Sequence, residues 1–126
     1  MSTKSKKSKI EVIKENSNYL RGPLDAEVDN DQPNFGKDAI QVLKFHGTYQ
    51  QDDRDLRKGR DRHWIFMIRG RTPGGKITAE QYLALDSIAS DFANNTIRVT
   101  TRQAFQLHGV IKKDLKKTIQ EINNAL

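Results

Sequence analysis

The sequence predicts an α+β domain in which two strands and two helices alternate along the second half of the chain. Three patterns lead to this prediction. Aromatic and aliphatic side chains fill residues 64–69 as in a strand, apolar residues recur at three- and four-residue intervals in 78–92, and apolar and polar residues alternate from 97 to 101. A further amphipathic segment at 114–126 completes the order β-α-β-α.

The first 63 residues are predicted to be less regular than the rest. Residues 1–15 are rich in lysine and serine, so we expect a flexible, solvated basic tail that buries too little to offset its ordering entropy. Residues 16–63 are expected to form an extended arm and a loop region, since Arg21-Gly22-Pro23 should end any local helix. Within this region Ala39–Phe45 is apolar and short, which favours one buried strand over a helix.

Two strands are predicted in residues 64–126. The first is Trp64–Arg69, whose aromatic and branched side chains suit a sheet and whose Trp64 is expected in the core. Pro and Gly at 72–75 then stand where a type II turn requires them. The second strand is predicted to run from Ile97 towards Lys113, with even-numbered side chains on one face.

Two helices are predicted between and after these strands. Thr78 and Gln81 have the spacing of a capping box, and an apolar stripe behind them is expected to face the core, with the members Tyr82, Leu85, Ile88, Ala89 and Phe92. Asp114 is predicted to cap the last helix, in which one face is formed by Leu115, Ile119, Ile122 and Leu126. A helix that joins two strands in this way suits a right-handed crossover, so residues 64–126 are predicted to form a ferredoxin-like half-domain. Its helices would cover one sheet face and leave the other free.

Composition and charge restrict the function. The 126 residues carry a formal charge of +6 and no cysteine, so anionic partners are favoured. Disulfides, thiolate nucleophiles and the thiolate ligands of an iron–sulfur cluster are excluded for this chain. His46 and His63 lack the spacing of metal ligands, so no metal site is predicted. The absence of any apolar stretch of signal or membrane length predicts a cytoplasmic protein.

The strand that begins at Ile97 has an unusually polar face. Its even-numbered residues are Arg98, Thr100, Arg102, Gln106 and His108. Guanidinium groups on an otherwise apolar strand are costly unless a partner supplies acceptors, and they suit paired carboxylate oxygens. Arg69 ends the preceding strand and could converge on this face. The predicted ligand is therefore a multiply charged anion, unless the arginines pair with Asp52, Asp53, Asp55 or Asp86.

Four motifs, in order, resemble the N-terminal region of the assimilatory sulfite reductase catalytic proteins. They are SNYLRGPL (17–24), KFHGTYQQDDRDLR (44–57), FMIRGRTPGGKIT (66–78) and IRVTTRQAFQLHGVIKK (97–113). The resemblance covers roughly residues 10 to 126 and is closer to the ferredoxin-dependent form than to the form paired with a flavoprotein. It implies the six-electron reduction of sulfite to sulfide in the cytoplasm, with ferredoxin as the donor.

The resemblance also implies cofactors and residue roles. Members of the family carry siroheme, an iron tetrapyrrole octacarboxylate, bridged to a 4Fe-4S cluster. By resemblance, Arg69 binds sulfite, and the cofactor's carboxylates are bound at the positions of Arg98, Arg102 and Gln106. Less defined roles in lining or supporting the pocket fall to Thr100, His108, Tyr49, Gln50 and Gln51.

The cysteines that hold the family's cluster lie in a later part of a much longer polypeptide. The chain is therefore expected to be incomplete and inactive alone, and to act with the remainder of the reductase or with a complementing chain. A small basic nucleic-acid-binding module is an alternative, because of the pI near 9.7 and the arginines at 69–71. Against this alternative, Phe105 is the one aromatic in the apolar register of the strand near Arg98, whereas base stacking requires several exposed rings. A non-catalytic assembly or regulatory fragment of a reductase is a third interpretation.

Overall fold

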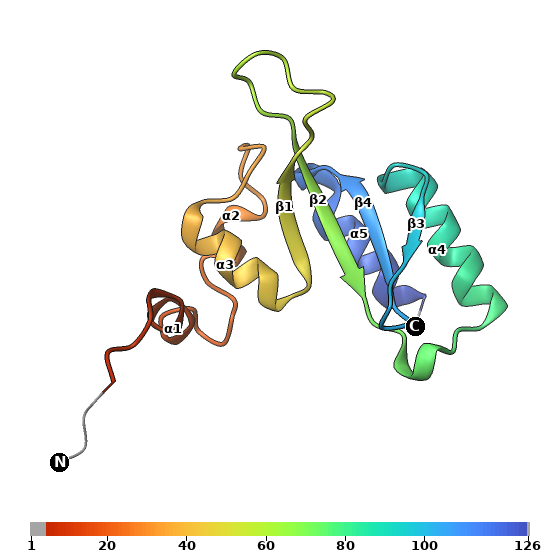
Figure 1. Ribbon diagram of the computed structural model, residues 1–126, viewed down its shortest axis with the longest axis horizontal. Helices are drawn as coiled ribbons and strands as arrows, with labels where there is room; N and C mark the ends of the chain where they lie inside the picture. Colours follow the sequence, from red (N-terminus) through yellow and green to blue (C-terminus); the bar gives the residue numbers. More distant parts are fainter. Residues whose placement is uncertain (1–4, 126) are drawn as a thin grey trace.

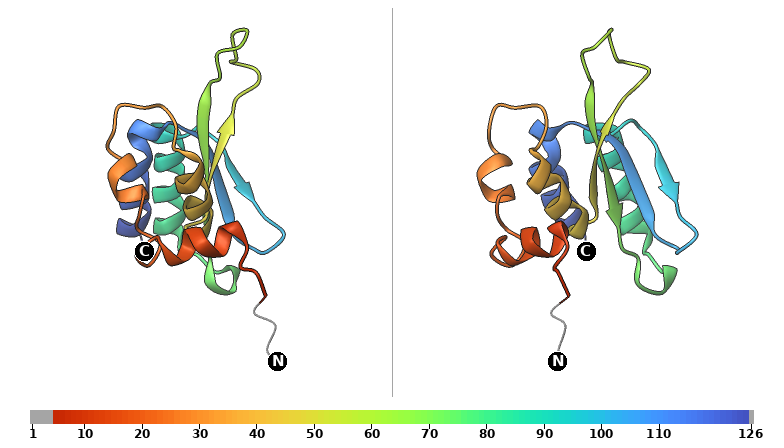
Figure 2. Two further views of the ribbon diagram at one scale, coloured as in Figure 1. Left: turned by 90° about the vertical axis from the view of Figure 1, so that its left-hand side faces the viewer. Right: turned by 60° about the vertical axis from the view of Figure 1, so that its left-hand side comes forward.

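The computed structural model describes residues 5–125 and contains one antiparallel sheet with helices packed on one of its faces (Figures 1 and 2). The strands lie in the order β1 (Thr48–Asp52), β2 (Trp64–Gly70), β4 (Phe105–Val110) and β3 (Ile97–Val99). The predicted α+β class is confirmed. The expectations for the first four residues and for Leu126 lie outside the described residues.

The strand β4 lies between β2 and β3, so the connection through α4 (Ala79–Phe92) is a split β-α-β unit, as the ferredoxin-like prediction requires. The prediction of a single strand from Ile97 to Lys113 is wrong, because the segment is a hairpin followed by the start of α5 (Lys112–Asn124). The turn is closed by Thr100, whose backbone N–H donates to the carbonyl of Ala104 over 2.9 Å and whose hydroxyl accepts from the N–H of Ala104 over 3.3 Å. Polar and apolar residues alternate through both strands, which hides this turn in the sequence.

The core lies between the sheet and the helices. Alternate strand side chains point into it, among them Phe66, Ile68 and Leu107, which are at most 4% exposed. Helix residues from the predicted stripes complete it, namely Leu85, Ile88, Ala89 and Leu115. Two predicted core residues lie outside the core cluster: Tyr82 is 56% exposed, and Trp64 is half-buried beneath the guanidinium of Arg62. Both stand at the margin of the helix–sheet contact.

The arm contains more helix than expected. The segment predicted as a buried strand forms most of α3 (Lys37–Phe45), and Ala39, Val42 and Leu43 face the core at helical spacing. A short apolar segment satisfies either period, and here the helix packs beside β1. A second short helix, α2 (Leu24–Glu27), precedes α3 in the arm. Outside the arm, the short helical segment η1 (Pro73–Gly75) follows β2.

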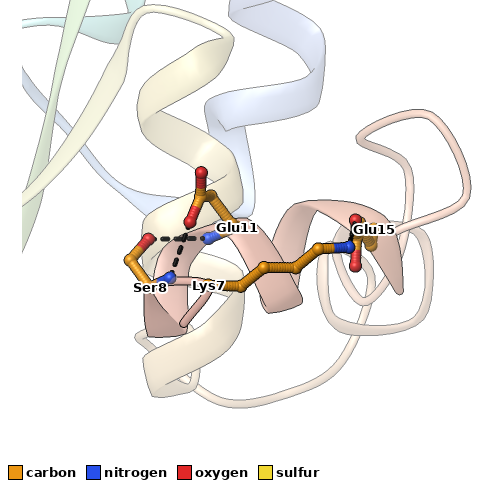
Figure 3. A network of polar contacts seen from close by, with 4 residues as sticks. All are labelled: Lys7, Ser8, Glu11 and Glu15. Atoms are coloured by element: carbon orange, nitrogen blue, oxygen red, sulfur yellow. Dashed lines mark hydrogen bonds and ion pairs between the residues drawn. The ribbon is translucent and has the colours of Figure 1, made fainter. Parts of the chain in front are cut away.

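The predicted tail is also partly helical. Helix α1 (Lys9–Glu15) begins at Ser8, whose hydroxyl accepts from the N–H of Glu11 while the Glu11 carboxylate accepts from the N–H of Ser8 (Figure 3). Lys7 forms an ion pair with Glu15. The helix buries no side chain, so these local contacts act on a solvated segment.

The two long helices begin differently from one another. The predicted capping box of α4 is confirmed, with the N–H of Thr78 donating to Gln81 Oε1 over 2.9 Å and the Gln81 N–H donating to Thr78 Oγ1 over 3.1 Å. Asp114 is not the cap of α5, which begins two residues earlier at Lys112 after Ile111. None of the helices in residues 5–125 is long and apolar enough to cross a lipid bilayer.

Lys112 attaches the arm to the domain. It is only 4% exposed, and its ammonium donates to the Asn30 side chain and, over 3.0 Å, to the carbonyl of Gln32. The same ammonium lies 4.8 Å from the ring centroid of Phe35, and burial lowers the pKa of Lys112. An early start of α5 is required for this contact.

We predict that Lys112→Ala destabilises the fold by about 1–3 kcal/mol, because the buried Lys112 side chain loses its hydrogen bonds to Asn30 and Gln32 and its packing on Phe35. The free energy of unfolding by urea measures the effect. Lys116→Ala is the matched control, since Lys116 pairs with Asp29 on the surface, and it should cost at most about 0.5 kcal/mol. Equal effects of the two substitutions would contradict the assignment.

Candidate functional site

A row of polar side chains crosses the sheet face that the helices leave open. In the pairing of the strands, Gln106 on β4 lies opposite Arg69 on β2 and opposite Arg98 on β3. Side chains at paired positions share a face and lie about 5 Å apart at their Cβ atoms. The structure therefore brings together three residues that the sequence predicted for the site.

A hollow of about 750 Å³ lies beside this row. It is lined by four predicted site residues, Arg69, Thr100, Arg102 and Gln106. The sequence analysis placed Thr100 and Arg102 on a strand. In the structure they lie in the β3–β4 turn and its approach. Because this turn lies beside the end of β2, the folded chain gathers arginines that are distant in sequence.

Arg71 also lines the hollow, and sequence reasoning did not include it in the site. It stands one residue beyond β2, where the turn at 72–75 was expected to begin. The available signal was its spacing of two residues from Arg69, which places both side chains on the same side of an extended backbone.

His108 continues the open face along β4. Its Nε2 lies 3.2 Å from Gln106 Oε1, a contact that fits the neutral ring with hydrogen on Nε2. Burial lowers the pKa of His108, and the positive charge of Arg98 lowers it further. β4 then carries one residue more than β2, where Gly109 has a φ of 82°. This bulge ends the regular pairing next to His108.

Three predicted site residues lie on β1, a strand where the sequence had predicted a loop, and they separate onto its two faces. The ring of Tyr49 lies on the open face, with its centroid 5.4 Å from the guanidinium carbon of Arg69, and Gln51 shares its side of the strand. Gln50 turns the other way, and its Oε1 accepts from the N–H of Phe35 over 2.7 Å. Gln50 therefore holds the arm and does not join the arginines.

Among the residues that the structure describes, no carboxylate forms an ion pair with the arginines of the open face. Within residues 5–125 the ion pairs are Lys7–Glu15, Arg57–Asp52, Lys116–Asp29 and Lys117–Glu121. The suggestion that nearby aspartates neutralise the arginines is thus wrong, and Asp52 is paired with a residue of its own loop. The face presents guanidinium, amide and hydroxyl donors to solvent, which is the donor set for a multiply charged anion.

A second hollow, of about 630 Å³, lies on the helix side and is mainly apolar. Its walls include Leu24, Phe35 and Ile119, and Arg69 and Arg71 line it as well as the basic hollow. Within the described range, no group of three His, Asp or Glu side chains is placed to hold a metal ion. The basic hollow on the open face is therefore the candidate site.

Comparison with known proteins identifies similar chains. The family model described as "Nitrite/Sulfite reductase ferredoxin-like half domain" matches residues 57–125. The chain is 51% identical over 118 residues to "Sulfite reductase [ferredoxin]" of Synechococcus elongatus, with 93% of this chain and 19% of the relative covered. It is 52% identical over 126 residues to "Sulfite reductase [NADPH] hemoprotein beta-component" of Anoxybacillus flavithermus, with 94% of this chain and 22% of the relative covered.

One solved structure, that of the NirA protein of Mycobacterium tuberculosis, aligns with a TM-score of 0.73 at 22% identity. The alignment covers 91% of this chain and 23% of that chain, and it supports the fold alone. The chain spans about a fifth of the length of the curated relatives that it matches.

The lowered pKa of His108 predicts a pH dependence of stability. Neutral His108 contributes stability above the unfolded-state pKa of about 6.5, and this contribution is lost as the pH falls through the lower folded-state pKa. On acidification from about pH 7.5 to 5, wild type should therefore lose more stability than His108→Gln, as measured by urea unfolding. The control is His63→Gln on the exposed β1–β2 loop, which should follow wild type. Parallel pH profiles for wild type and His108→Gln would contradict the prediction.

Proposed function

Because the chain belongs to the nitrite and sulfite reductase family with the ferredoxin-like half-domain, we propose that it supplies one wall of a sulfite reductase active site. The main observation behind this proposal is the hollow on the open sheet face, whose arginines form no ion pair with a carboxylate of residues 5–125. Residues 64–126 would be the half-domain that bears the site, with an arm at 16–63 and a basic tail at 1–15.

The residues of the open face fit the siroheme that the family resemblance implies. The carboxylates around the edge of siroheme require hydrogen-bond donors that acidic side chains of the protein do not already occupy. The hollow offers the guanidinium of Arg102, the hydroxyl of Thr100 and the amide of Gln106. Arg98 extends this set across the sheet by its pairing with Gln106. When bound, siroheme supplies the iron at which sulfite is reduced.

Arg69 is proposed to bind sulfite. It lies at the end of β2 between Tyr49 and Gln106, and the contact with the Tyr49 ring orients its guanidinium on the open face. A fixed positive charge binds the sulfite oxygens and stabilises the charge that remains on each oxygen as its bond to sulfur breaks. Tyr49, Gln51 and neutral His108 would support the arginines from the same face.

The chain cannot hold the iron–sulfur cluster of the proposed enzyme by cysteine, since it contains none. We therefore propose that the cysteine ligands come from another stretch of polypeptide, joined to this one or separate, and that this chain alone does not reduce sulfite. The relatives include both a ferredoxin and an NADPH form. The net charge of +6 favours an acidic ferredoxin as the electron donor. The proposed location of the reaction is the cytoplasm.

The test is reconstitution of the chain with siroheme, with and without a cysteine-bearing reductase polypeptide from a family member. We expect a visible spectrum of bound siroheme in the assembled protein and sulfite reduction only there. Sulfite reduction by the chain alone would contradict the proposed division of the active site. Absence of bound siroheme in every combination would contradict the proposed function itself.

Replacement of a carboxylate-binding arginine should weaken retention of siroheme. For Arg98→Ala or Arg102→Ala in the assembled protein, we predict a loss of affinity of roughly 10- to 100-fold, because each removes charge-assisted hydrogen bonds. The siroheme absorbance that remains after gel filtration measures the loss. The control is Arg62→Ala, in the β1–β2 loop at the opposite end of β2 from the hollow. Undiminished absorbance in both site variants would refute the assignment.

Replacement of the sulfite-binding arginine should have a different effect. We predict that Arg69→Ala lowers kcat/KM for sulfite by roughly 100-fold or more while most siroheme is retained, since the charge acts on the substrate. Steady-state kinetics normalised to siroheme content measure this. A normalised rate equal to wild type would show that Arg69 has no such role.

A further inference from the structure

We propose that Arg71 is an additional cofactor-binding residue of this site, and that it binds an anionic side group of the tetrapyrrole rather than the substrate. The inference rests on the proposed function and extends it to a residue outside the predicted set. Its basis is a second row of positions on the open face, parallel to the row that contains Arg69.

The pairing of β2 with β4 defines this second row. Gly70, the last residue of β2, lies opposite Phe105, the first residue of β4, and Arg71 and Ala104 are the next position beyond this last pair. The carbonyl of Ala104 in turn accepts from the N–H of Thr100 over 2.9 Å. The row Arg71–Ala104–Thr100 thus repeats the row Arg69–Gln106–Arg98 two residues further along, at a distance of about 7 Å.

The small side chain of Ala104 leaves room between Arg71 and Thr100. Arg71, Ala104 and Arg102 all line the 750 Å³ hollow. The middle position of the second row is Ala104, where the first row has the longer Gln106. A ligand group can therefore approach the backbone at Ala104. Arg102 reaches the hollow from the adjacent turn, which brings a second positive charge to the same end.

Two loops hold this end of the hollow in place. A Cβ atom on Gly75 would lie only 2.7 Å from Gln103 Oε1, so the turn that follows Arg71 packs directly against the turn that carries Arg102. Gly75 has a φ of 69°, which glycine adopts readily. The relative position of Arg71 and Arg102 is therefore determined by a close contact between their loops.

The spread of the cations favours a large anion with several charged groups over a small one. The two rows lie about 7 Å apart along the strands, so a small ion contacts both only if the arginine side chains bend towards each other. The carboxylates around a tetrapyrrole are spread widely enough to meet the first row and the second together. Arg71 has no carboxylate partner among residues 5–125, so its guanidinium is available to such a group.

The experiment is a titration with siroheme, followed by its visible absorbance, of this chain assembled with the cysteine-bearing polypeptide. We expect Arg71→Gln to weaken siroheme binding roughly tenfold and Arg71→Lys to recover part of the affinity, since lysine keeps the charge but not the fork of donors. Arg62→Gln, on the exposed β1–β2 loop, is the matched control and should bind as wild type does. Circular dichroism checks that each variant is folded.

Two further readouts separate this role from others. Ala104→Leu should weaken binding while every arginine remains, because it fills the hollow between Arg71 and Thr100. In the siroheme-loaded fraction, Arg71→Gln should leave KM for sulfite unchanged. Wild-type siroheme affinity in Arg71→Gln, or a raised KM with unchanged siroheme affinity, would overturn the inference and leave the proposed function intact. A wild-type assembly that binds no siroheme would instead overturn the proposed function.

Discussion

The antiparallel pairing of β2 with β4 is the constraint on which the other features depend. The two strands lie in the middle of the sheet, and their register sets which side chains face the helices and which face outward. Phe66, Ile68 and Leu107 enter the core from one face, while Arg69 and Gln106 stand on the other. A slip of one residue would exchange these sets, so the burial of the core also determines the position of the arginines.

The open face carries positive charge that the fold itself does not neutralise. Repulsion among exposed guanidinium groups is weakened by water, and the apolar contacts of the opposite face compensate for what remains. The lowered pKa of His108 is part of the same field, because burial and the charge of Arg98 both oppose a further proton there. A polyanion bound on this face would oppose the effect of Arg98 and favour protonation of His108.

The arm shows where sequence reasoning failed and why. Ala39–Phe45 satisfied both the strand and the helix period over its short length, and contact with β1 and the core decided in favour of α3. Gln50 was assigned to the pocket with its neighbours in the same motif, yet its amide holds the backbone of Phe35 on the opposite face. The role of Lys112 as an attachment for the arm depends on residues about 80 positions away, which no local pattern reveals.

The sequence by itself determined what depends on local spacing and composition. The capping box at Thr78, the alternation along Trp64–Gly70, the outward parity of Arg69 and the lack of cysteine ligands all follow from neighbouring residues or from counting. Tertiary structure decided which strands are adjacent, that 97–110 is a hairpin, and that Arg71 belongs to the hollow. The reason is that strand pairing is a long-range contact: its register depends on how distant apolar faces pack together.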